Sequence, residues 1–212
     1  MEAYWEKRFV SGGRIWGDAP SRTAVRAERI FRDHGIKNLI IPGAGYGRHV
    51  DFFAAAGYRV TGIEISAHAI ALARTMPGVR YRQGSVLDES LYTESYDAVY
   101  GFNILHLFRA AERLRFIELL QRAVRGGGLV FLTGFSEEEP QYGRGKTVEE
   151  NTYESKPGRS VHFFNEPEMR SAIKGWAVLE AGLIDDPENH GAAGPHTHRI
   201  RYVCAQKPDP SA

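Results

Sequence analysis

The chain has 212 residues, a length that fits one α/β domain. Its content of 42% hydrophobic and 25% charged residues is ordinary for a protein that buries a core. The formal net charge of +1 shows none of the basic excess typical of a nucleic-acid-binding surface. The single cysteine, Cys204, excludes an internal disulfide and a metal site built from several cysteines.

The sequence contains no apolar stretch as long as a membrane-spanning helix. Its first residues, Met1–Lys7, lack the apolar region of a signal peptide. We therefore expect a soluble, cytoplasmic protein whose partner is neither a membrane nor a nucleic acid. Neither composition nor charge indicates an oligomeric state.

Taken in chain order, the hydrophobic pattern predicts helices that alternate with strands. Ser66 and Asn165 are good N-caps, and Glu168 completes a capping-box pattern with Asn165. Glycines 126–128 are expected to close the longest helix. The expected helices cover residues 22–34, 48–57, 67–74, 110–124 and 165–173. The expected strands cover residues 38–41, 59–65, 79–83, 98–102, 129–135, 176–183 and 199–206.

This alternation predicts a doubly wound, Rossmann-like, mostly parallel sheet of seven strands that is covered on both faces. Ligands of such sheets lie beyond the carboxyl ends of the strands, so the loops after the strands are the informative ones. Two of these loops are long, over residues 136–165 and 184–198. Long loops in compact domains are usually functional or disordered.

The most informative segment is a glycine turn between the first two expected strands. Gly43, Gly45 and Gly47 alternate directly after the first strand, and Glu64 ends the second strand 21 residues after Gly43. Glycines allow the backbone close to a ligand, and a carboxylate in this place can accept both hydroxyls of a ribose. The pattern therefore indicates a nucleoside-containing cofactor. Arg48 stands where a dinucleotide fingerprint has its third glycine, which argues against an NAD-linked oxidoreductase.

Nearly the whole chain resembles the class I methyltransferases that use S-adenosylmethionine (SAM). The resemblance is carried by the glycine turn, the run from Gly62 to Ser66, the run from Gln83 to Val86, the fourth strand with its end at His106, and glycines 126–128. Within that superfamily the segment from Tyr4 to Pro20 is similar to the thiopurine methyltransferase and TehB tellurite-resistance branches. The resemblance implies SAM as cofactor and a last strand that is antiparallel to the others.

The resemblance also implies roles for individual residues. Arg8 and Trp16 would belong to a segment covering the cofactor, although the spacing around Arg8 equally fits a helix that only docks by its aromatic side chains. The turn would approach the methionine part of SAM, Glu64 would hold the ribose, and Ile65 would pack on the adenine. The predicted cofactor-binding residues are Arg8, Trp16, Gly43, Ala44, Gly45, Glu64, Ile65, Ser85, Val86, Gly101 and Phe102.

The chain departs from the family pattern in two places. Ile41 stands where an acidic residue commonly precedes the first glycine, and Ser85 replaces a common aspartate near the adenine. The fourth strand also lacks the Asn-Pro-Pro-aromatic run of enzymes that methylate exocyclic base amines. This last difference argues against an exocyclic amine of a nucleobase as the acceptor.

Histidines are the predicted catalytic residues. His190 and His196 lie in the second long loop, with His198 nearby, and His106 follows the fourth strand. One of them could act as base for a neutral acceptor, and the alternative for each of the four is a packing or surface role. Histidines in this number could also bind zinc, but the loop is rich in glycine and proline and has no rigid element to support it, so no metal is predicted.

These observations predict one SAM-dependent methyltransferase domain over residues 1–212 that acts on a small polar acceptor such as a thiol or a chalcogen anion. Residues 1–35 would form an N-terminal lid, residues 36–135 the SAM-binding core, and the two long loops the substrate side. Two alternatives stay open: a SAM-binding sensor or scaffold without turnover, and a methyltransferase that acts on RNA or protein.

Overall fold

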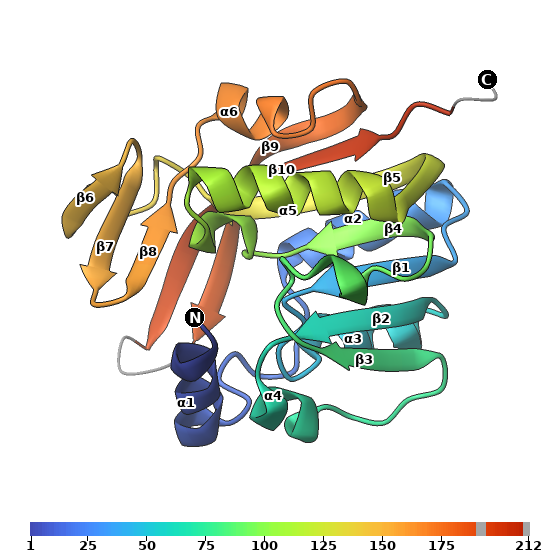
Figure 1. Cartoon of the computed structure of the whole chain (residues 1–212), viewed down its shortest axis with the longest axis horizontal. Helices are drawn as coiled ribbons and strands as arrows, with labels where there is room; N and C mark the ends of the chain where they lie inside the picture. Colours follow the sequence, from blue (N-terminus) through green and yellow to red (C-terminus); the bar gives the residue numbers. More distant parts are fainter. Residues whose placement is uncertain (190–193, 210–212) are drawn as a thin grey trace.

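The computed structural model describes residues 1–189 and 194–209. Its centre is a seven-stranded sheet in the order β3-β2-β1-β4-β5-β10-β9 (Figure 1). The strands of this sheet are β1 (Asn38–Pro42), β2 (Arg59–Glu64), β3 (Val79–Gln83), β4 (Tyr96–Gly101), β5 (Val124–Phe135), β9 (Ala177–Asn189) and β10 (Pro195–Gln206). The helices are α1 (Glu2–Gly12), α2 (Arg22–Asp33), α3 (Arg48–Ala55), α4 (Ala67–Leu72), α5 (Ala110–Ala123) and α6 (Glu166–Ser171).

The pairing of the strands confirms the predicted fold class. Strands β1 to β5 pair in parallel, while β10 is antiparallel to both of its neighbours, β5 and β9. The parallel strands end at one edge of the sheet, and the loops that follow them meet there. This edge is where a doubly wound sheet binds its ligands.

The sheet separates two hydrophobic cores, which explains why the central strands are apolar throughout. Ile40 of β1 belongs to the core under α5, whereas Leu39 and Ile41 belong to the core under α2 and α3. Successive side chains of a strand point to opposite faces, so a strand covered on both faces needs apolar residues at every position. Figure 1 shows α5 in front of the sheet and α2 and α3 behind it.

Two predicted helix starts are observed, one of them with a different partner than expected. The Ser66 hydroxyl accepts the Ala69 amide at 3.0 Å, and the Asn165 side chain accepts the Glu168 amide at 2.8 Å. The capping box at Asn165 was only half right, because the Glu168 carboxylate bonds the His162 ring at 2.8 Å instead. That contact links α6 to His162, in the segment that precedes the helix.

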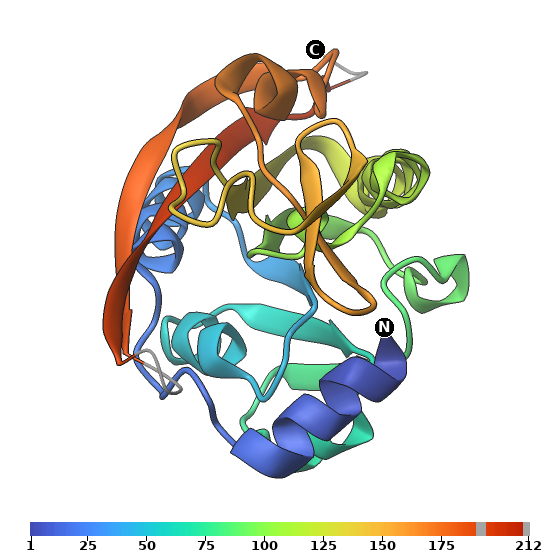
Figure 2. The ribbon, with the colours of Figure 1, turned by 90° about the vertical axis from the view of Figure 1, so that its left-hand side faces the viewer.

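The segment over residues 136–165, which was predicted as a loop, contains structure of its own. Strands β6 (Lys146–Glu149), β7 (Thr152–Lys156) and β8 (Arg159–His162) form a separate antiparallel sheet. Figure 2 shows this small sheet and α1 on the same side of the molecule. The short strands are mainly polar, and a polar pattern predicts a surface loop and not a strand.

The prediction of a loop over residues 184–198 is also wrong, because β9 extends to Asn189 and β10 begins at Pro195. The sequence there is polar and contains prolines, so it lacks the apolar alternation by which strands were identified. Glycines 126–128 were predicted to end a helix, but they lie inside β5. A Cβ atom on Gly128 would stand 2.7 Å from the Asp97 carbonyl oxygen, so close packing of β4 and β5 requires glycine there.

Across residues 1–189 and 194–209, none of the helices is both long and apolar enough to cross a membrane.

Candidate active site

A cavity of about 820 Å³ opens at the carboxyl edge of the parallel strands. Its wall is formed by α1, by the loops that follow β1 to β4, by the small sheet and by the tip of the β9–β10 hairpin. Cavities of roughly 300–1,000 Å³ are typical of small-ligand sites. The cavity therefore lies where the fold class predicts a ligand.

Most of the predicted site residues meet in this one cavity. The lining includes Arg8, Trp16, Gly43, Ala44, Gly45, Glu64, Ile65, Ser85, Val86, Phe102, His106 and His196. Gly101 is not part of the lining. A Cβ atom on Gly101 would stand 2.7 Å from the Leu132 side chain, so its observable role is to let β4 pack on β5. His190 lies outside the described residues.

The glycine turn after β1 has the backbone geometry that only glycine adopts easily. Gly43, Gly45 and Gly47 have φ values of 71°, 56° and 91°. The amides of Gly43 and Ala44 donate to the Ile63 carbonyl at 2.8 and 2.9 Å, and so hold the turn against the end of β2. Gly43 and Gly45 line the cavity, and the close approach of the turn to a ligand stays a prediction.

Glu64 ties the end of β2 to the same turn. It is only 5% exposed, and its carboxylate accepts the Gly45 amide at 2.7 Å and the Ser66 amide at 2.8 Å. Burial raises the pKa of this carboxyl group, against the two backbone hydrogen bonds, which lower it. A carboxylate has about four lone-pair positions, so these backbone bonds do not use up the acceptor capacity of Glu64.

An aromatic cluster covers the turn from the other side. Trp16 stacks on Tyr46 with ring centroids 6.1 Å apart, and Phe9 of α1 meets both rings edge-on. The Trp16 amide donates to the Tyr46 hydroxyl at 2.9 Å. Helix α1 is thus anchored next to the glycine turn, and Trp5, Arg8 and Phe9 face the cavity.

Two buried histidines, His49 and His106, line the cavity at the carboxyl edge of the sheet. Burial lowers the pKa of both His49 and His106 well below the ordinary value, so both rings are neutral near pH 7. The His49 ring contacts Phe102 at 4.5 Å between ring centroids, and His106 contacts Phe135 at 4.4 Å. Within the described residues, Nδ1 of His106 has no hydrogen-bond partner.

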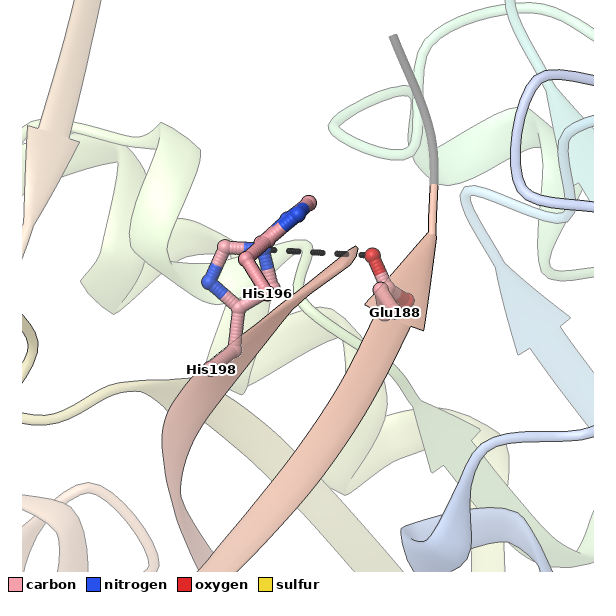
Figure 3. A group of neighbouring side chains, drawn as sticks. All are labelled: Glu188, His196 and His198. Atoms are coloured by element: carbon pink, nitrogen blue, oxygen red, sulfur yellow. Dashed lines mark hydrogen bonds and ion pairs between the residues drawn. The ribbon is translucent and has the colours of Figure 1, made fainter. Parts of the chain in front are cut away.

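The tip of the β9–β10 hairpin presents a group of polar side chains to the same cavity (Figure 3). Glu188 of β9 is directly opposite His196 of β10, and His198 follows two residues later. Residues opposite each other in an antiparallel pair, and residues two apart on one strand, share a face of the sheet. The three side chains therefore converge, with their ligand-type atoms all within 4.8 Å of one another.

Several lining residues were not predicted from the sequence. Tyr46 and His49 follow the glycine turn, and Glu139, Lys156 and Arg159 reach the cavity from the region of the small sheet. A signal existed for the first two, since they occupy the expected loop and helix start. None existed for the others, because the small sheet was not recognised.

The comparisons with known proteins agree with this arrangement. A family model described as "Methyltransferase domain" matches residues 42–128, the stretch from the glycine turn through β5's glycines. The chain is similar to a probable thiol methyltransferase 2 of Arabidopsis thaliana, with 25% identity over 160 residues that cover 71% of this chain and 69% of that protein. Residues 42–128 therefore match a methyltransferase domain, and the chain is similar to SAM-dependent methyltransferases.

Similar folds occur among solved methyltransferase structures. The Burkholderia thailandensis 1,6-didemethyltoxoflavin-N1-methyltransferase, solved with S-adenosylhomocysteine, superimposes with a TM-score of 0.71 at 22% identity and covers 98% of this chain and 87% of that one. TehB of Haemophilus influenzae superimposes with a TM-score of 0.68 at 15% identity, and the match covers 96% of this chain and 67% of that one. A third structure concerns the conversion of a disulfide bond into a thioacetal group during echinomycin biosynthesis. It superimposes with a TM-score of 0.73 at 17% identity, and the match covers 98% of this chain and 93% of that one. These likenesses concern the fold, and the finer assignment to the thiopurine or TehB branch stays a prediction.

The cofactor of this methyltransferase is SAM, and the cavity fits it. Gly43 and Gly45, which the positive φ values favour, leave space for a ligand beside the turn, the Glu64 carboxylate can accept a hydrogen bond from a ribose hydroxyl, and Ile65 and Val86 offer an apolar surface to an adenine ring.

Proposed function

We propose that this methyltransferase transfers the methyl group of SAM to a sulfur or related chalcogen atom of a small, polar and anionic acceptor. The observation that carries the proposal is a group of three basic side chains in the cavity wall. Arg144, Lys156 and Arg159 all line the cavity, and each comes from the region of the small sheet. Basic side chains in this place suit an acceptor that carries a carboxylate or another anionic group.

Sulfur as the acceptor atom is supported by the names of two similar proteins. The Arabidopsis relative is described as a probable thiol methyltransferase, and the structure related to echinomycin biosynthesis concerns a disulfide. A thiol has an ordinary pKa of about 8.5, so a useful fraction is ionised near neutral pH without a dedicated base. Bound SAM supplies an electrophilic methyl group, and the residues of this chain have to position the acceptor and exclude water.

We assign the residues of the chain to three parts. Residues 36–135 are proposed as the SAM-binding core, residues 1–35 as a lid whose Arg8 and Trp16 cover the cofactor, and residues 136–165 and 184–198 as the acceptor side. The whole of residues 1–212 would act as one methyltransferase domain. The contact between the Arg159 guanidinium and the Tyr4 hydroxyl, at 3.1 Å, supports this division because it joins the acceptor side to α1 above the cavity.

Among the histidines predicted to be catalytic, His106 is proposed as the proton acceptor for a substrate that is not already ionised. Its ring is neutral and lines the cavity, and the unpartnered Nδ1 can accept a hydrogen bond. His190 cannot be assigned from the described residues.

An acceptor panel tests the proposal. Purified protein is incubated with SAM and with thiols, selenols, phenols or amines, each with and without a carboxylate, and S-adenosylhomocysteine and the methylated product are followed by mass spectrometry. We expect thiols and selenols that carry a carboxylate to give the highest kcat/KM. Turnover of phenols or amines with none for any chalcogen would contradict the proposal.

The basic wall is tested by Arg159→Gln. Removal of one charge-assisted hydrogen bond in a partly dry site costs about 1.5–3 kcal/mol, so kcat/KM for the anionic acceptor should fall by about ten- to a hundredfold. SAM affinity should change by much less. Arg170→Gln is the matched control, since Arg170 pairs with Glu166 on the exposed surface of α6 and does not line the cavity. Equal loss of activity in both variants would remove Arg159 from the acceptor site.

A further inference from the structure

The hydrogen bonds of the two hairpin histidines fix which ring nitrogens carry hydrogen. Nδ1 of His198 lies 2.7 Å from the Glu139 carboxylate, and Nδ1 of His196 lies 2.8 Å from the Gly194 carbonyl. Both partners are oxygen acceptors, so each Nδ1 is a donor and carries the ring hydrogen. In a neutral imidazole the other nitrogen then presents a lone pair.

Those two lone-pair nitrogens face each other. Nε2 of His196 and Nε2 of His198 are 3.2 Å apart, and a Glu188 carboxylate oxygen lies 3.9 Å from Nε2 of His198 (Figure 3). Two lone pairs at such a distance repel each other unless a proton or a metal cation lies between them. Two nitrogens bound at about 2.0–2.1 Å to one tetrahedral zinc ion stand about 3.3 Å apart, which matches the observed separation.

We propose that Glu188, His196 and His198 bind a zinc-class divalent cation at the acceptor end of the methyltransferase cavity. The ligand set of two imidazoles and one carboxylate is typical of zinc sites with an open fourth position. The hairpin register supplies it directly, since Glu188 is opposite His196 and His198 shares their face. The carboxylate has to approach by about 1 Å to complete the coordination shell.

The surroundings of the three side chains favour a cation. The Glu139 carboxylate accepts the hydrogen of His198, an arrangement that orients metal-bound histidines and makes them better donors. Asp186 is opposite His198 in the hairpin and is 2% exposed, and one of its carboxylate oxygens lacks a hydrogen-bond partner among the described residues. Arg48 donates to the second oxygen of Glu188 at 3.0 Å and so orients this carboxylate. One guanidinium offsets only part of the negative charge of the neighbouring carboxylates.

The position of the site gives the cation a role in acceptor binding, and this part rests on the proposed function. All three ligands line the cavity that also contains the cofactor residues. A thiol that occupies the open position loses its proton to solvent and binds as thiolate. Its sulfur electron pair then forms the new bond to the methyl carbon, while the pair of the broken bond stays on the cofactor sulfur, giving a thioether and S-adenosylhomocysteine. A neutral thioether is a weaker ligand than a thiolate, so the product can leave.

Metal binding is tested without any activity measurement. Tag-free protein is stripped with a chelator and titrated with zinc in a competition assay with a chromophoric chelator, and cobalt is added separately to record the visible bands of a tetrahedral site. We expect one equivalent of zinc and a higher melting temperature with zinc bound. Absence of saturable zinc binding, or binding that all variants below retain, would overturn the proposal.

The variants separate ligands from bystanders. His198→Asn and Glu188→Gln should each weaken zinc binding by about a hundredfold or more. Glu139→Gln changes the hydrogen bonds to the His198 ring and to the Arg199 amide but removes no proposed ligand, so it should weaken zinc binding by about ten- to a hundredfold. His34→Asn is the control, because His34 is exposed at the C-terminal end of α2, does not line the cavity, and its ring bonds the Ile30 carbonyl of the same helix. Circular dichroism and the melting temperature of the metal-free variants show whether each is folded, and the near-isosteric Glu188→Gln keeps the test available if a histidine variant is not.

The outcomes distinguish this inference from the proposed function. Zinc binding without methylation of any chalcogen acceptor would leave the metal site and remove the proposed acceptor. Equal thiol methylation by the zinc-free and zinc-loaded protein would overturn the role of the cation in acceptor binding. SAM binding by the zinc-free protein is measured by calorimetry as the check that the cofactor site is intact.

Discussion

The Glu64 carboxylate accepts the backbone amide of Gly45 at 2.7 Å, so the residue expected to hold the ribose also fixes the turn expected to hold the methionine part of SAM. The second carboxylate oxygen accepts the Ser66 amide. The cofactor side of the cavity therefore depends on a single buried side chain, and a change at Glu64 has consequences for both binding and folding.

Glu64→Gln should weaken SAM binding by about tenfold or more, because hydrogen bonds to a charged acceptor contribute about 1.5–3 kcal/mol each. The amide nitrogen of glutamine would also face a backbone N–H group, and an unsatisfied buried donor costs about 1–3 kcal/mol of folding stability. Calorimetry with SAM and urea unfolding measure the two effects. Glu6→Gln is the matched control, because Glu6 also contacts Ser66 but does not line the cavity. Wild-type SAM affinity in Glu64→Gln would remove Glu64 from the cofactor site.

The pH dependence of SAM binding should follow the same carboxyl group. Burial is the main reason why the pKa of Glu64 is raised, and the nearby Glu6 carboxylate adds to the effect. A raised folded-state pKa means that the charged carboxylate opposes folding, and this cost disappears as the pH falls through that pKa. SAM binding has the opposite sign, because the ribose hydroxyls need the carboxylate as acceptor.

We therefore expect SAM affinity to fall with decreasing pH in a window above the ordinary glutamate value of about 4.3. Calorimetric titrations at several pH values give the profile, and Glu64→Gln should bind more weakly but with a flatter profile. An identical pH profile in the variant would assign the titration to another group.

The contact of the glycine turn with the cofactor is tested by comparing alanine variants at Gly45, in the turn, and at Gly35, outside it. Gly45 and Gly35 both have positive φ, and a Cβ atom would meet no neighbour closer than 3.6 Å at Gly45 and none within 4 Å at Gly35. Each alanine should therefore cost about 1–2 kcal/mol of stability through the left-handed backbone alone. Only Gly45→Ala places a methyl group at the cavity wall, so only that variant should lose SAM affinity. Equal SAM affinity in the two variants would show that the turn does not contact the cofactor.

The cofactor half of the site could be predicted because its signals are local. The strand, the turn and Glu64 lie within one short stretch of sequence, and a residue such as Ser66 caps the next helix by a contact with Ala69, three residues away. Local patterns of this kind are fixed by backbone geometry and by short-range hydrogen bonds. The structure reproduces β1, β2 and β3 nearly as predicted.

The acceptor half could not be predicted because it depends on pairing over longer distances. His198 bonds Glu139, 59 residues away, and Arg159 bonds Tyr4, 155 residues away. His198 and Arg159 lie in mainly polar parts of β10 and β8, and a polar strand becomes recognisable only when its partner is known. The histidines were noticed, but the register that places Glu188 opposite His196 was not available from the pattern.

The aromatic cluster over the turn makes the proposed lid measurable by fluorescence. The chain has three tryptophans, of which Trp5 and Trp16 line the cavity while Trp176 packs against the core under α5. Trp16 lies in a stack with Tyr46, so a bound cofactor changes its surroundings. SAM should therefore alter the tryptophan emission of the wild type and of Trp176→Phe, and the response should be largely lost when Trp5 and Trp16 are both replaced by Phe. Since an aromatic contact contributes about 0.5–1.5 kcal/mol beyond its buried area, Trp16→Phe alone should weaken SAM binding by about two- to tenfold. A full response in the double variant, together with unchanged SAM affinity in Trp16→Phe, would mean that α1 and Trp16 only dock on the fold and do not cover the cofactor.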